Sequence, residues 1–173
     1  MYFRFRSDNS PINESSETII TRISETSKKN YRFHVDYTVL PWLTLKNRIE
    51  YLTYKTGNNP VQDGFMIYQD ILIRPQNQPF DVSLRYAIFD TDTYDERLYA
   101  YENDVLYAFS IPAYYYQGSR FYCVFRYELG KNLDFWLRYA RTFYNNQTSV
   151  GSGLDESEGN IRSEFKAQLR FKF

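Results

Sequence analysis

The stretch NIRSEFKAQLRFKF, residues 160–173, decides the fold, because polar and apolar side chains alternate along it with a period of two. One face is apolar apart from a single serine and carries Ile161, Ser163, Phe165, Ala167, Leu169, Phe171 and Phe173. The other face is polar and mostly charged and carries Asn160, Arg162, Glu164, Lys166, Gln168, Arg170 and Lys172. A period of two is that of a β-strand, so the stretch predicts a strand with one apolar and one charged face.

The same alternation recurs through most of the preceding sequence, interrupted by short polar segments. The predicted strands are residues 1–6, 17–25, 31–39, 43–54, 65–74, 80–89, 97–102, 105–115, 120–129, 133–143 and 160–173. No segment has the periodicity of a helix, and no crossover segment separates one strand from the next. The sequence therefore predicts an all-β fold, an antiparallel up-and-down meander of about 10–12 strands.

The connections between these strands form a short set and a long set. Short turns are predicted at 41–42, 75–79 and 130–131, and longer polar loops at 56–63, 90–96 and 145–159. The two sets alternate along the chain only if another reversal lies between residues 97 and 118. Glu102-Asn103-Asp104 is the expected place, because Asn and Asp tolerate turn geometry. Short turns at one end and long loops at the other are typical of outer-membrane barrels.

The composition excludes several classes of protein. The net charge is zero, with 21 basic and 21 acidic residues, so there is no electrostatic footprint for nucleic acid. No stretch approaches 18 consecutive apolar residues, which excludes a transmembrane helix. Cys123 is the only cysteine, so the chain has no intrachain disulfide. Aromatic residues make up 20% of the chain, an abundance that favours β-structure.

Charged polar faces, aromatic residues at strand ends and the final aromatic residue together favour a transmembrane β-barrel. Its polar faces would then line a lumen, and Phe173 would act as the outer-membrane insertion signal. The predicted lumen-facing residues are Arg32, His34, Asp36, Lys46, Arg48, Glu50, Asp81, Arg85, Arg126, Asp134, Arg138, Lys166 and Arg170. A soluble lipocalin-like barrel that binds a small apolar or aromatic ligand has the same period and stays as an alternative.

Few residues suggest chemistry. His34 and Asp36 point to the same side of a strand, so an outer-membrane hydrolase that uses them is a second alternative. No nucleophile motif accompanies the pair, and we expect neither an enzyme nor a cofactor. Two acidic loops could hold a divalent ion, alone or bridged to lipopolysaccharide, although neither has the spacing of a calcium-binding hand. Their carboxylates are Asp90, Asp92, Asp95, Asp155, Glu156 and Glu158.

Three consecutive tyrosines, Tyr114, Tyr115 and Tyr116, form the densest aromatic cluster in the sequence. They could stack on sugar or nucleobase rings. We expect instead that they belong to an aromatic belt at a membrane interface.

Three motifs carry a family resemblance: FDTDTYD at 89–95, YAYENDVLY at 99–107 and GSGLD at 151–155. With them, residues 35–173 resemble the C-terminal β-barrel of Bacteroidota outer-membrane proteins of the helix-hairpin-helix-containing type. The resemblance implies a bacterial outer-membrane location, contact with membrane lipid and lipopolysaccharide, and insertion by the barrel-assembly machinery. The helix-hairpin-helix region would imply DNA contact, but it is not among these residues, so no nucleic-acid role is carried over.

Residues 1–173 are expected to form a single outer-membrane barrel domain. Met1 is followed by Tyr-Phe-Arg-Phe-Arg rather than by a signal-peptide pattern, so we expect the barrel to be N-terminally incomplete. The expected role is a passive pore, a scaffold or the membrane part of an uptake system. The sequence leaves the oligomeric state open.

Overall fold

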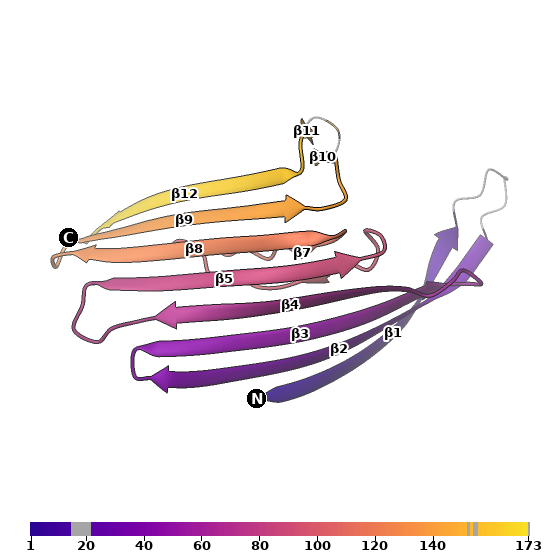
Figure 1. Cartoon of the computed structure of the whole chain (residues 1–173), viewed down its shortest axis with the longest axis horizontal. Coiled ribbons are helices and arrows are strands. Elements are labelled where there is room, and N and C mark those ends of the chain that lie inside the picture. The colour runs from indigo at the N-terminus through magenta and orange to yellow at the C-terminus, as the bar shows by residue number, and fades with distance from the viewer. Residues whose placement is uncertain (15–21, 152, 154–155, 173) are drawn as a thin grey trace.

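A computed structural model describes residues 1–14, 22–151, 153 and 156–172. Its main feature is one antiparallel sheet of eight strands in the order β1-β2-β3-β4-β5-β8-β9-β12 (Figure 1). The strands are β1 (Tyr2–Glu14), β2 (Arg22–Leu40), β3 (Leu43–Thr56), β4 (Gln62–Ile73), β5 (Phe80–Thr91), β8 (Gly118–Leu129), β9 (Leu133–Tyr144) and β12 (Ile161–Phe171). Two small hairpins pair β6 (Leu98–Tyr99) with β7 (Ala113–Tyr114) and β10 (Ser149–Val150) with β11 (Ser157–Glu158).

The predicted all-β antiparallel meander is confirmed, but about eleven strands is the wrong number for its sheet. The predicted strands at 97–102 and 105–115 do not join the sheet, because β5 pairs directly with β8 from Phe80↔Tyr127 to Phe89↔Gly118. The reversal predicted between residues 97 and 118 is present, because Leu98–Tyr99 pairs antiparallel with Ala113–Tyr114 and Glu102 bridges to Ser110. Its turn lies at residues 105–108 rather than at Glu102-Asn103-Asp104. Residues 92–117, here called the inserted segment, instead fold back over one face of the sheet. Among the described residues, no helix has the length and apolar character needed to cross a membrane.

The first hairpin is also longer than its sequence pattern indicates. β1 continues to Glu14, well beyond the strand predicted at residues 1–6, and β2 runs without a break through residues 26–30, which separate the predicted strands 17–25 and 31–39. Antiparallel pairing satisfies backbone groups whatever the side chains are, so a polar hairpin arm needs no apolar alternation. Pro11 is tolerated because β1 has a free edge in the described sheet. The rest of the predicted strand at 17–25 lies partly outside the described residues.

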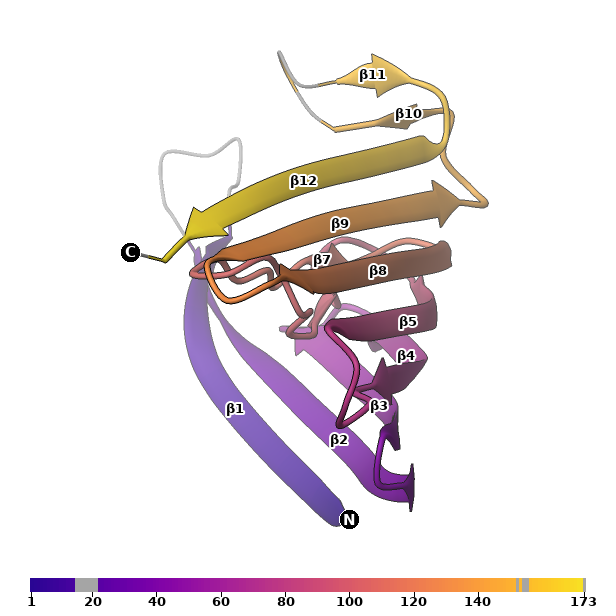
Figure 2. The same cartoon turned by 90° about the vertical axis from the view of Figure 1, so that its left-hand side faces the viewer.

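The sheet is strongly curved, and its two faces differ in chemistry (Figure 2). On the convex face, apolar residues follow one another across the ladders, as in the row Phe33, Ile49, Ile67 and Ile88. The last three of these side chains are 50%, 46% and 50% exposed. The charged side chains of the same strands point to the concave face, where the inserted segment lies.

The apolar core forms where the inserted segment packs on the concave face. Its buried members are Leu52, Met66, Tyr68, Ala87, Phe89, Leu98, Ala100, Tyr114, Tyr144 and Val150. Gly118 closes this region, because a Cβ at this position would collide with the backbone carbonyl of Phe143 and touch the ring of Phe89. The glycine thus lets the end of the inserted segment rejoin the sheet beside β9.

The predicted connections alternate between the two ends of the sheet, but their lengths divide less cleanly than the sequence predicts (Figure 1). The links β2–β3 (41–42), β4–β5 (74–79) and β8–β9 (130–132) share one end, and the β4–β5 link is longer than the β3–β4 link (57–61) at the other end. The links β3–β4, β5–β8 and β9–β12 share the other end, and the β5–β8 link is the inserted segment.

Candidate functional site on the concave face

The inserted segment docks on the sheet through its backbone. Residues 98–102 alternate, with Leu98, Ala100 and Glu102 buried and the two tyrosines between them exposed. The carbonyls of alternate residues accept hydrogen bonds from sheet arginines, and each arginine comes from a different strand. Arg48 donates to Tyr99 O (3.1 Å), Arg85 to Tyr101 O (2.9 Å) and Arg138 to Asn103 O (3.3 Å). The charged face of the sheet thus supplies the donors that the extended segment needs.

Glu102 is the centre of this docking, and its side chain is fully buried. Arg120 donates to both of its oxygens, from Nε at 2.7 Å and from Nη2 at 3.0 Å. Arg138 Nη2 donates to Glu102 Oε2 at 2.5 Å. A buried carboxylate is tolerated only when it is paired and hydrogen-bonded, and two arginines meet that condition here.

Glu102 belongs to a wider group whose charges balance, here called the central ion cluster. Its cations are Arg120, Arg138 and Lys166, and its carboxylates are Glu102, Asp104 and Glu164, three of each sign. Lys166 Nζ lies 2.6 Å from Asp104 Oδ2, so β12 also reaches the inserted segment. The cluster therefore ties β8, β9 and β12 to the inserted segment.

Tyr114 adds a neutral donor to the central ion cluster. Its hydroxyl donates to Glu102 Oε1 at 2.8 Å, and its ring packs edge-on against Phe89 with centroids 5.4 Å apart. Burial, and then the nearby Glu102 carboxylate, raise the pKa of the Tyr114 hydroxyl well above its ordinary value. Tyr114 therefore keeps its proton and stays a donor to Glu102 at neutral pH.

The tyrosine cluster does not form the aromatic belt that the sequence predicts. Tyr114 is 1% exposed, so it is a core residue. Tyr115 is half-buried and packs against Tyr94, Tyr116 and Tyr144. Interior packing therefore accounts for Tyr114 and Tyr115 better than either a belt or a stacking platform.

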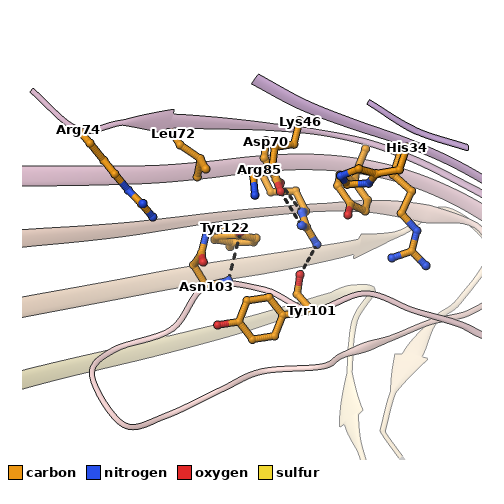
Figure 3. Close-up of a pocket in the computed structure, with 11 residues that line it drawn as sticks. His34, Lys46, Asp70, Leu72, Arg74, Arg85, Tyr101, Asn103 and Tyr122 are labelled. Carbon is orange, nitrogen blue, oxygen red and sulfur yellow. Dashed lines mark hydrogen bonds and ion pairs between the residues drawn. The ribbon is translucent and has the colours of Figure 1, made fainter. Parts of the chain in front are cut away.

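A cavity of about 250 Å³ remains beside the docked segment (Figure 3). Its walls come from β2, β3, β4, β5, β8 and the inserted segment, with Arg74 just beyond the end of β4. It is lined by His34, Lys46, Arg48, Tyr68, Asp70, Leu72, Arg74, Arg85, Tyr101, Asn103 and Tyr122. In Figure 3 Arg85 is central, with dashed bonds to Asp70 and to Tyr101.

All residues predicted to line a lumen project from the concave face, as their ladder positions show. Five of them are buried: Arg48, Glu50, Arg85, Asp134 and Arg138. Glu50 accepts from Arg32 and from Arg48, and Asp134 pairs with Arg170 and Lys172. Near the short-turn end, Arg126 lies 3.1 Å from Asp81. Facing a lumen stays a prediction for these residues.

His34 and Asp36 do contact each other, with Nε2 and Oδ1 2.6 Å apart. A hydrolase of the serine type needs the second ring nitrogen to face a nucleophile. His34 Nδ1 is buried and has no hydrogen-bond partner among the described residues. The geometry therefore gives the hydrolase alternative no support.

The carboxylates of the acidic loops accept hydrogen bonds from different donors. Asp90 accepts from Gln117, Asp92 from the backbone of Asp63, and Glu156 from Ser149. Asp95 and Glu158 are exposed. Asp155 and Phe173 lie outside the described residues. Within the part of the chain that the structure describes, no three carboxylate, histidine or cysteine side chains gather as a metal site would require.

Sequence reasoning missed the residues that organise the site: Asp70, Glu102, Asp104, Tyr114, Arg120, Tyr122 and Glu164. The signal for three of them was present, because Asp70, Arg120 and Glu164 lie on charged strand faces in the sequence. The sequence predicts a turn at Glu102 and Asp104, because nothing local shows that this segment folds back on the sheet. No family model, curated protein or solved structure matches the chain.

Proposed function

We propose that the chain is an integral β-barrel protein of the bacterial outer membrane, with an interior occupied by the inserted segment. The carrying observation is the convex face, which leaves a continuous apolar surface exposed. Its row Tyr37, Leu45, Ile71, Leu84, Cys123, Tyr139 and Phe165 crosses seven strands. Soluble proteins rarely expose a contiguous apolar surface of this extent, whereas lipid is its natural solvent.

Strand length agrees with this proposal. The strands β4, β5, β8 and β9 have 12 residues each. A tilted strand needs about 9–11 residues to cross the hydrocarbon core. Antiparallel pairing also satisfies the backbone groups of the six inner strands, and in the proposed barrel the outer edges of β1 and β12 are paired as well, as a bilayer demands.

The direction of the curvature argues against the soluble lipocalin-like alternative. A soluble barrel that binds an apolar ligand turns its apolar face inward. Here charged side chains project from the concave face, while large apolar side chains on the convex face are exposed. The inserted segment and its ion pairs therefore occupy much of the space that this alternative needs for an apolar ligand.

Among the roles of pore, scaffold and uptake component, the inserted segment favours the last two. Buried ion pairs and arginine–carbonyl hydrogen bonds hold it against the inner wall. An open passive pore would keep that wall wet, whereas here Arg120, Arg138 and Glu102 are all buried. The segment thus narrows the passage along the interior.

The test is extraction and refolding of the chain. We expect the purified protein to need detergent, to resist carbonate extraction from membranes and to migrate differently on gels when unheated. A chain that stays monomeric and soluble without detergent would overturn the proposal. In planar bilayers, low conductance is the expected result, and a large steady conductance would favour the passive pore instead.

A further inference from the structure

We propose that the cavity beside the inserted segment binds a small oxyanion of the phosphate type. Four of its lining side chains are cationic, namely Lys46, Arg48, Arg74 and Arg85, and one is a carboxylate, Asp70. This surplus contrasts with the central ion cluster, where the two signs balance. The inference rests on the described concave face and holds whether or not the convex face meets lipid.

Asp70 does not neutralise the surplus. Its two oxygens accept from Arg85, from Nε at 2.5 Å and from Nη2 at 2.7 Å. Arg85 also donates to Tyr101 O and lies over the Tyr68 ring at 3.7 Å, so both members of this pair are fully engaged. Arg48 is likewise paired, because it donates to Glu50 and to Tyr99 O.

Lys46 and Arg74 are left without a counter-charge. Neither side chain has an ion pair with any described carboxylate, although both line the cavity. Asp36 and Asp70 lie opposite Lys46 on its two neighbouring strands, but Asp36 Oδ1 is held by His34 at 2.6 Å and both oxygens of Asp70 are held by Arg85. Lys46 is half-buried and Arg74 is exposed, so two cations without an ion pair stand at the cavity wall and are available to an anion.

Polar atoms without a hydrogen-bond partner at the same wall are a second, independent observation that favours a bound anion. Arg48 is 6% exposed, and its Nε is buried without a hydrogen-bond partner. His34 Nδ1 is in the same condition. A buried polar group without a partner is costly, so both atoms favour a hydrogen-bonding group in the cavity, whether water or a ligand.

The two unpartnered atoms match hydrogen phosphate. Arg48 Nε is a donor and needs an oxygen acceptor. When His34 Nε2 donates its hydrogen to Asp36, neutral His34 presents Nδ1 as an acceptor, which suits the O–H group of a hydrogen phosphate. A cavity of about 250 Å³ has room for this ion with some of its water.

The same chemistry could come from free phosphate or from a lipid headgroup. The cavity opens on the concave face, opposite the exposed apolar rows, so the free anion is the source that this geometry favours. Calorimetric titration of the folded chain with inorganic phosphate in nonionic detergent should show saturable binding with one ion per chain. The absence of saturable binding would overturn the proposal.

Substitutions of the lining cations test whether phosphate binds in this cavity. Lys46→Gln together with Arg74→Gln should weaken phosphate binding at least tenfold, because both uncompensated charges are removed. Lys55→Gln removes a cation from the far end of the same strand, outside the cavity, and should bind phosphate as the original chain does. Equal affinity of the double variant and the Lys55 control would overturn the assignment.

Two further measurements separate a loss of phosphate binding from a loss of folding, and free phosphate from a lipid headgroup. Since Lys46 and Arg74 make no ion pair, the double variant should unfold at the same urea concentration as the original chain when phosphate is absent. If the double variant does not fold, Arg74→Gln alone is tested, and unchanged affinity then counts against the site. Anionic phospholipid in mixed micelles should not compete with phosphate, and competition that depends on Lys46 and Arg74 would overturn the free-anion assignment.

Discussion

The convex and concave faces of the sheet are built by the same strands, yet they differ in which side chains are exposed and which are buried. On the convex face, Ile49, Ile67 and Ile88 are neighbours across the ladders, and about half of each side chain is exposed. On the concave face, Arg85, Arg138 and Glu102 are charged and nearly or wholly buried. Charges that a soluble protein usually leaves in water are thus buried on the concave side, beside the apolar core, while large apolar side chains on the convex face stay exposed.

What covers a face, rather than its polarity, decides how the side chains of that face are held in place. The concave face is covered by the inserted segment, which brings a carboxylate and backbone carbonyls to match the arginines. The convex face is covered by nothing within the described chain, and we propose lipid as its cover. Each face therefore makes its own prediction about substitution.

The largest effect is expected from a substitution that removes the buried ion pairs on the concave face. Glu102→Gln removes the carboxylate that Arg120 and Arg138 share, leaving two buried cations that Glu164 and Asp104 only partly compensate. Loss of one partner of a buried ion pair costs about 3–5 kcal/mol. We expect the inserted segment to detach, and chymotrypsin to cleave it more than 100-fold faster than in the original chain.

Glu128→Gln is the matched control for Glu102→Gln. Glu128 pairs with Arg126, but its side chain is 45% exposed, so the same change should cost less than about 1 kcal/mol. Similar protease sensitivity of the two variants would mean that Glu102 does not anchor the segment.

The convex face should respond to charge according to what covers it. Ile67→Arg places a cation in the middle of β4, between Ile49 and Ile88. Against lipid, an arginine near the bilayer midplane costs about 2–4 kcal/mol, whereas at an exposed site in water the change stays within about 0.5 kcal/mol. We expect the larger value from urea unfolding of the chain in lipid bilayers.

Val61→Arg is the control for that measurement. Val61 is 57% exposed and lies in the link between β3 and β4, outside the strands. Its substitution should leave the unfolding free energy unchanged within about 0.5 kcal/mol. If Ile67→Arg were as harmless as Val61→Arg in bilayers, lipid would not be the cover of the convex face.

The contrast between the faces could be predicted from sequence because it depends only on a period of two. Arg48 and Ile49 are adjacent in sequence, and alternation alone sends one to each face. The position of the inserted segment could not be predicted in this way. Residues 98–102 alternate as a strand would, but a docked extended segment and a sheet strand have the same local pattern.

The ion pairs of the site could not be predicted from the sequence for a related reason. Glu102 meets Arg138 across 36 positions of the chain, and Lys166 meets Asp104 across 62. Such pairs depend on which segment covers the sheet, and the sequence pattern does not identify that segment. The polar arm of β1 and β2 was missed because backbone pairing continued where side-chain alternation stopped.

The smallest predicted effect concerns the tip of the inserted segment. Tyr107 has a φ of 62° and occupies the third position of a turn in which Ala108 N donates to Val105 O at 3.1 Å. Left-handed backbone at this position favours glycine, and a side chain there costs about 1 kcal/mol. Tyr107→Gly should therefore slow chymotrypsin cleavage of the segment relative to Tyr107→Ala, by about fivefold.

Comparing the glycine and alanine variants isolates the backbone, because both lose the Tyr107 ring, which is 88% exposed, and its contact with Arg170. Only the alanine keeps a Cβ in the left-handed conformation. Cleavage is followed at Phe109, which both variants retain. If the alanine variant proved as resistant as the glycine variant, the turn would not limit opening, and the central ion cluster alone would hold the segment on the concave face.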